Sequence, residues 1–130
     1  MIFHHDLRLM VVKPKGVLDN EWIEKVMATV TAAESQTGTA FNRFVDLSAV
    51  TQFRLDPKHA YRVATVRRMD YVDKPTMKSA YYVTTEKAAQ LANICAIVTK
   101  SSPLQVRVFN DIPAAAEWLG VSEQDLAGNL

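Results

Sequence analysis

The sequence has few of the residues that mark disulfide frameworks, phosphate-binding loops or membrane spans. One cysteine among 130 residues excludes an intramolecular disulfide. The four glycines, Gly16, Gly38, Gly120 and Gly128, are too scattered for a Rossmann or P-loop phosphate cradle. No apolar run approaches the ~18 residues that cross a bilayer. We therefore expect no membrane insertion.

The amino terminus also lacks a charged region followed by an apolar stretch, so no secretory signal is visible. A single cysteine and no signal favour a reducing, cytoplasmic setting. Cys95 lies among aliphatic residues, and nothing nearby in the sequence would lower its pKa. We expect it to be a buried core residue rather than a nucleophile.

Catalytic and metal-binding motifs are missing as well. The chain has no G-x-S-x-G elbow and no H-E-x-x-H zinc motif. His4 and His5 are adjacent, so in a strand they point to opposite faces, and His59 would have to join them by tertiary folding. Asp46 and Asp56 are separated by a loop and are not an evident acid–base pair. We expect no enzymatic activity, no metal and no cofactor.

Composition and charge are those of an ordinary soluble domain. The chain is 48% hydrophobic and 22% charged, with a formal net charge of +1. This balance gives no bias toward nucleic acid, and no aromatic platform interleaves with the basic residues. We expect one domain over residues 1–120. Residues 121–130 are then an acidic C-terminal tail, because no Lys or Arg follows Phe109.

The apolar periodicity alternates between the strand and helix repeats along the chain. Leu7, Leu9 and Val11 recur at every second position, as in a strand with one buried face. Asp19 is placed to cap the helix that follows. The predicted elements are strands at 2–4 and 7–13, a helix at 20–34, a strand at 41–48, a helix at 57–69, a strand at 77–84, a helix at 85–98, a strand at 104–109, and a helix that begins after Asn110 or Asp111 and ends at Gly120.

These elements predict an α/β fold with a mixed sheet in β-β-α-β-α-β-α-β-α order. Strands joined by helical crossovers must run mainly parallel, with right-handed crossovers. The first two strands are joined by a tight turn, so we expect that pair to be antiparallel.

The stretch 41–68 is the most informative part of the chain. A buried strand ends on Asp46 and Ser48, and Asp56-Pro57 supplies an N-cap and a first-turn proline for a basic helix. Strand ends followed by helix starts are where α/β folds bind ligands and partners. The candidate binding residues are Asp46, Ser48, Arg54, Lys58, Arg62 and Arg68.

Charge supports two interpretations of this stretch. Residues 54–68 contain five Lys or Arg and one Asp, a formal charge of +4 that leaves −3 for the rest of a +1 chain. The basic side chains are either a solvated helix face or a patch for an anionic ligand or an acidic partner.

Three segments resemble the STAS domains, the anti-sigma-factor-antagonist fold, and especially the SpoIIAA-like group. Residues 15–19 are similar to the glycine-containing entry to the first helix. Residues 44–50 are similar to the central strand ending in Asp-Leu-Ser, and residues 107–111 with 116–119 to the closing strand and Trp-Leu helix. The resemblance spans residues 2–119 and implies a STAS-like fold with a regulatory role.

The sequence departs from that family at its switch. STAS regulators carry a phosphorylatable Ser in a D-S-S/T-G-type turn at the start of the second helix. Here the turn falls near Arg54-Leu55-Asp56-Pro57, which has neither Ser nor Gly. Ser48 or Thr51 would have to accept a phosphate instead, and Asp56 is favoured as a helix cap over a permanent negative charge.

Two functions follow as expectations. The first is a non-enzymatic regulatory or protein-interaction module that lacks the usual phosphoacceptor serine. The alternative is a small-ligand protein of SpoIIAA-like or CRAL-TRIO-like architecture, with an apolar cleft near the strand ends for a lipid or an anion. Exposed edge strands in such sheets often pair, so homo-oligomerisation stays open.

Overall fold

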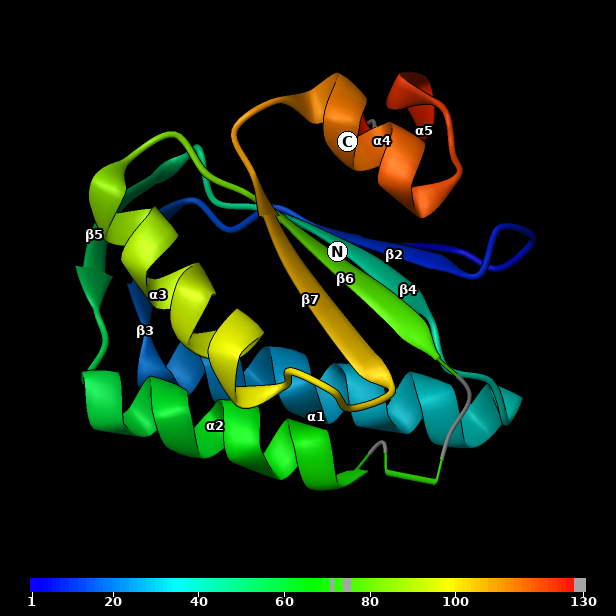
Figure 1. Ribbon diagram of the computed structural model, residues 1–130, viewed down its shortest axis with the longest axis horizontal. Helices are drawn as coiled ribbons and strands as arrows, with labels where there is room; N and C mark the ends of the chain where they lie inside the picture. The colour runs from blue at the N-terminus through cyan, green and yellow to red at the C-terminus, as the bar shows by residue number, and fades with distance from the viewer. Residues whose placement is uncertain (71, 74–75, 128–130) are drawn as a thin grey trace.

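In the computed structural model of the chain, helices cover both faces of a five-stranded sheet (Figure 1). The structure describes residues 1–70, 72–73 and 76–127. Helices α1 (Asn20–Thr37), α2 (Pro57–Asp70) and α3 (Glu86–Val98) cover one face. Helices α4 (Ile112–Leu119) and α5 (Glu123–Ala127) cover the other. The predicted α/β class is confirmed.

The main sheet has the strand order β1-β2-β4-β6-β7. Only the pair β1–β2 is antiparallel, and the three other pairs are parallel. The mixed sheet and both strand directions agree with the sequence-based prediction. The strands are β1 (Ile2–His4), β2 (Leu9–Val12), β4 (Asn42–Asp46), β6 (Met77–Tyr82) and β7 (Leu104–Phe109).

Short polar side chains begin the helices where the sequence predicts them. Asp19 accepts a hydrogen bond from the Trp22 N–H at 2.9 Å and caps α1. Asp56 accepts one from the Lys58 N–H at 3.0 Å at the start of α2, which supports its assignment as a cap. Thr85 and Asp111 cap α3 and α4 in the same way. Within the described ranges, no helix is both long enough and apolar enough to span a membrane.

Strand β2 is buried on both faces, and the prediction of a single buried face was wrong. Leu9 and Val11 belong to a core cluster with residues of α4 and α5. Met10 and Val12 belong to another cluster with Val30 of α1. Helices on both sides of a parallel sheet leave no solvent-facing side for its inner strands.

The predicted element order omits two strands that form a separate two-stranded parallel sheet, β3 (Gly16–Asp19) with β5 (Val50–Arg54). Each strand is short, and only Leu18 and Val50 in them are buried. Neither segment therefore carries an apolar alternation that would predict a strand.

Helix α5 occupies part of the segment that the sequence suggested as an acidic tail. It contains Glu123 and Asp125, but its Leu126 is buried in the same core cluster as Leu9, Val11 and Phe44. Ser122 and Asp125 hydrogen-bond each other's backbone N–H, which stabilises this turn of helix. Residues 128–130 lie outside the described residues.

The packing of α5 predicts a large cost for truncating its inward side chain. Leu126→Ala should lower the free energy of unfolding by about 3 kcal/mol, as for other buried leucines. Leu7 is partly exposed, so Leu7→Ala should cost less than about 0.5 kcal/mol. Urea denaturation of both variants measures this, and equal small losses would show that α5 adds nothing to the core.

Candidate ligand-binding cavity

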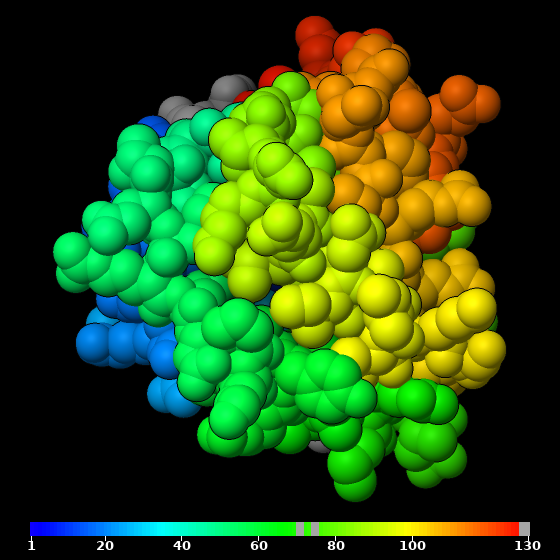
Figure 2. All heavy atoms as spheres, turned by 60° about the vertical axis from the view of Figure 1, so that its left-hand side comes forward, coloured from blue at the N-terminus to red at the C-terminus, as the bar shows by residue number. Residues whose placement is uncertain are grey.

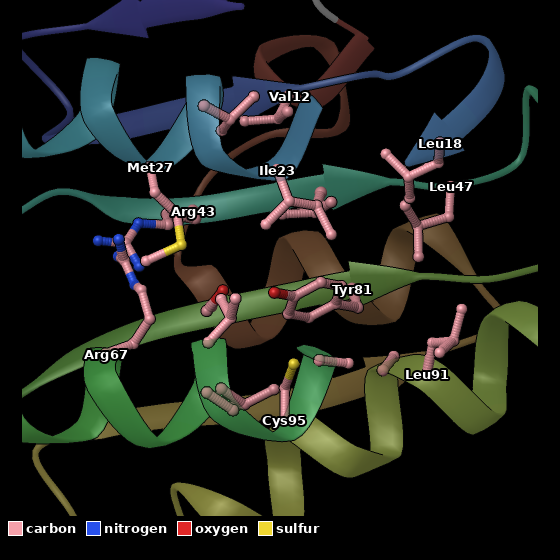
Figure 3. Close-up of a pocket in the computed structure, with 18 of the residues that line it drawn as sticks. Val12, Leu18, Ile23, Met27, Arg43, Leu47, Arg67, Tyr81, Leu91 and Cys95 are labelled. Carbon is pink, nitrogen blue, oxygen red and sulfur yellow. The ribbon is translucent and has the colours of Figure 1, made fainter. Parts of the chain in front are cut away.

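An apolar cavity of about 160 Å³ lies between the sheet and the helices α1, α2 and α3 (Figure 3). Its floor is formed by β2, β4, β6 and β7, for example by Val12, Val45 and Val106. Leu18 of β3 and Leu91 of α3 contribute further apolar walls. Figure 2 shows the outer surface of β5, α2 and α3, which together cover this side of the protein. The cavity thus lies on this face of the sheet and is partly open to solvent.

Short side chains on α2 and α3 leave this space unfilled. The residues of α2 that line it include Ala60, Val63 and Ala64, and α3 contributes Ala92. These side chains are short, so they fill only part of the space between the two helices and the sheet. Met27 of α1 faces the same space in Figure 3. The sequence thus leaves unfilled space between the sheet and these helices.

Two buried arginines make one end of the cavity polar. Arg43 extends from β4 and is 6% exposed, and Arg67 extends from α2 and is 9% exposed. Figure 3 shows both guanidinium groups at the same end of the cavity. Burying a cation is costly, so such residues are kept where they pair with an anion.

Glu34, near the end of α1, supplies one such anion. It is 7% exposed, and its Oε2 lies 3.3 Å from Nη2 of Arg43. The same oxygen accepts a hydrogen bond from the Phe41 N–H at 3.0 Å. Glu34 does not belong to the cavity lining, so it holds Arg43 from behind and joins α1 to β4.

Tyr81 and Cys95 place weaker polar groups on the cavity wall. Their side chains are close enough to influence each other's pKa. Burial raises the pKa of the Tyr81 hydroxyl far above its usual range, although the charges of Arg67 and Arg43 act the other way. Burial also raises the pKa of the Cys95 thiol. Both groups are therefore neutral at physiological pH, and Cys95 is a poor nucleophile.

The six candidate residues from the sequence lie outside the cavity lining. Asp46 and Ser48 do come together, because Oδ1 of Asp46 accepts hydrogen bonds from the Ser48 N–H at 2.9 Å and from its hydroxyl at 2.6 Å. This arrangement forms the turn after β4. The hydrogen bonds between Asp46 and Ser48 therefore have a local structural role in this turn.

The four basic candidates are spread over the outer surface. Arg54 ends β5 and is exposed, and Lys58 and Arg62 are exposed on α2. Arg68 donates a hydrogen bond to the Val98 carbonyl at 3.3 Å and so ties α2 to the end of α3. Their exposure is compatible with both interpretations of the charge count, a solvated helix face and a basic patch for an anionic ligand or partner.

The sequence contained one signal for the cavity that the prediction did not use. Arg43 stands in a strand whose neighbours Phe41, Phe44 and Val45 are apolar, and a charge in such a strand is a candidate functional residue. Arg67 and Glu34 carry no comparable signal, because helices alternate charged and apolar residues on exposed faces as well.

Neither metal ligands nor known relatives identify the site. In the ranges that the structure describes, no three His, Cys, Asp or Glu side chains are grouped so that they could hold a metal ion. Comparison of the chain with protein-family models, curated proteins and solved structures found no match. The cavity therefore has to be interpreted from its own geometry.

The buried Glu34–Arg43 contact predicts a stability difference between two carboxylates on one helix. Glu34→Gln should lower the free energy of unfolding by about 3 kcal/mol, because it leaves a buried arginine without this counter-charge. Glu21→Gln is the matched control, since Glu21 pairs with Lys25 at 3.3 Å where both side chains are about three-quarters exposed.

The control variant should lose no more than about 0.5 kcal/mol. Chemical denaturation of the two variants gives both values. Equal losses would contradict a structural role for the buried pair.

Proposed function

We propose that this protein is a non-enzymatic carrier or sensor that binds a small, largely apolar molecule in the cavity beneath α2. The observation that carries this proposal is a partly open cavity with apolar walls and a few buried polar groups at one end. That combination is typical of small-molecule sites, in which apolar surface provides affinity and polar groups provide orientation.

The size of the cavity selects the size of the ligand. An engineered cavity of about 150 Å³ in another protein binds benzene, so about 160 Å³ fits one aromatic ring or a short acyl chain. A long-chain lipid needs several times this volume. The volume of the cavity therefore favours a molecule much smaller than a long-chain lipid.

Unfilled apolar volume also lowers the free energy of unfolding, and a ligand that fills the volume can raise it again. Side chains beside unfilled space lose the packing contacts that a filled core would give them. A ligand that fills it without strain recovers part of that free energy and raises the melting temperature.

Filling the cavity with a side chain should mimic the ligand and block it. Ala64 of α2 is buried and lines the cavity, so Ala64→Leu should raise the melting temperature and abolish ligand-induced thermal shifts. Ala28→Leu on the exposed face of α1 is the control and should keep those shifts. The screen uses benzyl alcohol, toluene, phenylacetate and hexanoate, with palmitate as the oversized probe.

A shift with small compounds but not with palmitate, lost in Ala64→Leu, supports the proposal. If no small compound shifts the wild-type protein, or if Ala64→Leu responds like the control, the cavity is not a binding site.

A second proposal is a protein-interaction module with a STAS-like fold. It is supported by the outer face of α2, where the basic Lys58 and Arg62 are exposed beside Tyr61 and Met69, which are 59% and 69% exposed. Exposed aromatic and apolar side chains among cations are typical of surfaces that bind an acidic partner. Homo-oligomerisation through the sheet edges stays a prediction.

Charge reversal tests this second function. The double variant Lys58→Glu with Arg62→Glu should remove any partner that co-purifies with the native protein in a fixed ratio. Lys100→Glu is the control, because Lys100 is exposed at the end of α3 and lies outside this face. Arg68 is unsuitable, since its bond to Val98 is structural. No partner, or one that both variants retain, would contradict the interaction module.

A further inference from the structure

We propose that Tyr81 sets the ligand specificity of the cavity, and that the ligand is a small uncharged molecule with one oxygen atom that accepts a hydrogen bond from the Tyr81 hydroxyl. Small aromatic alcohols, phenols and ketones share this chemistry. The inference rests on the proposed ligand-binding function. It names the chemical class of the ligand and the residue that selects it.

Tyr81 reaches the cavity from the middle of the sheet. It lies on β6, and its hydroxyl is directed into the cavity in Figure 3. Successive residues of a strand point to opposite faces of a sheet, so Tyr82 belongs to the core cluster on the other face. There the centroid of its ring lies 6.4 Å from that of Phe44. One strand thus brings one tyrosine to the cavity and the next to a packed core.

Tyr81 offers the cavity more surface than the two other hydroxyl groups in the described lining. Ser79 and Thr99 are each 2% exposed, and the Thr99 hydroxyl already donates to the Cys95 carbonyl at 2.7 Å. Tyr81 is only half-buried, although it lies beneath the helices. Since Tyr81 lines the cavity, the cavity accounts for this accessible surface. A ligand in the cavity therefore meets the Tyr81 side chain.

The Cys95 thiol is a weak partner for the Tyr81 hydroxyl. The two groups lie close enough to influence each other's pKa, but a thiol is a poor hydrogen-bonding group. The O–H of a tyrosine inside a protein usually has a better partner. An oxygen atom accepts a hydrogen bond more strongly than sulfur does. Hydrogen bonding thus favours a ligand that brings an oxygen to this place.

The surroundings of Tyr81 favour an uncharged ligand. Ile23, Leu47 and Leu91 line the cavity from α1, the turn after β4 and α3. Burying a charge among apolar walls costs far more free energy than burying a neutral oxygen that has a hydrogen bond. Burial also raises the pKa of Tyr81, so its hydroxyl stays protonated and acts as a donor. The volume of about 160 Å³ admits one ring with a short substituent.

The test uses two compounds of nearly the same shape, benzyl alcohol and ethylbenzene, which differ by a hydroxyl in place of a methyl group. Ethylbenzene is the more hydrophobic compound, so the affinity of each compound is compared between proteins and not with that of the other compound. Isothermal titration calorimetry measures both affinities in the wild-type protein and in Tyr81→Phe. This substitution keeps the ring and removes the hydroxyl.

A pair of tyrosine variants on one strand locates the effect. Tyr81→Phe should lower the affinity for benzyl alcohol about fivefold or more, because the oxygen of the ligand loses its donor. It should lower the affinity for ethylbenzene by no more than about twofold, since that compound accepts no hydrogen bond. Tyr82→Phe removes a hydroxyl on the opposite face of the sheet and should leave both affinities unchanged.

A measurement on the wild-type protein remains if Tyr81→Phe does not fold. Acetophenone accepts hydrogen bonds and donates none. The infrared carbonyl stretch of bound acetophenone should lie below its position in hexane, where no donor is present. A stretch at the hexane position would show that the cavity donates no hydrogen bond to the ligand, and the inference would then be wrong.

The outcomes separate this inference from the proposed function. If Tyr81→Phe lowers both affinities equally, lowers neither, or acts like Tyr82→Phe, the cavity binds small apolar molecules but selection by Tyr81 is wrong. If neither compound binds the wild-type protein, this inference and the proposed function are both overturned. A loss of affinity for benzyl alcohol alone, absent in Tyr82→Phe, supports both.

Discussion

The buried contact between Glu34 and Arg43 is the constraint on which the face of the sheet with the cavity depends. It joins the end of α1 to the central part of the sheet, and its carboxylate also holds the backbone at Phe41, where the chain enters β4. A buried ion pair is weak evidence for stability, since the desolvation of both ions offsets their attraction. The presence of this ion pair beside an otherwise apolar cavity is better explained by the orientation that Glu34 gives to the Arg43 side chain.

The cavity and the charge at its end have a common structural origin. Small residues on α2 and α3 leave the space, and Arg67, three residues beyond Ala64 on α2, brings a cation to its border. On the opposite face of the sheet, Leu119 and Leu126 belong to one buried core cluster with Leu9 and Phe44. The face covered by α4 and α5 thus has a filled core. The face covered by α1, α2 and α3 has a cavity with charged groups at one end.

Much of the fold could be predicted from the sequence because local signals and tertiary packing agree. Asp19, Thr85 and Asp111 cap helices as their positions suggest, and the strand directions follow from the crossovers. The short strands β3 and β5 lack an alternation, and α5 depends on the burial of Leu126, so their formation requires tertiary contacts. The cavity could not be predicted either, because the residues that line it come from strands and helices spread along the chain that meet only in the folded protein.

The central proposal is that a small, largely apolar molecule binds in the cavity beneath α2, and methionine methyl groups report on such binding directly. Met10 and Met27 line the cavity, whereas Met69 is exposed on the outer face of α2. With ¹³C-methyl-methionine labelling, titration of benzyl alcohol should shift the NMR signals of Met10 and Met27 and leave that of Met69 unchanged. Shifts confined to Met69, or no shift at saturating benzyl alcohol, would contradict the account.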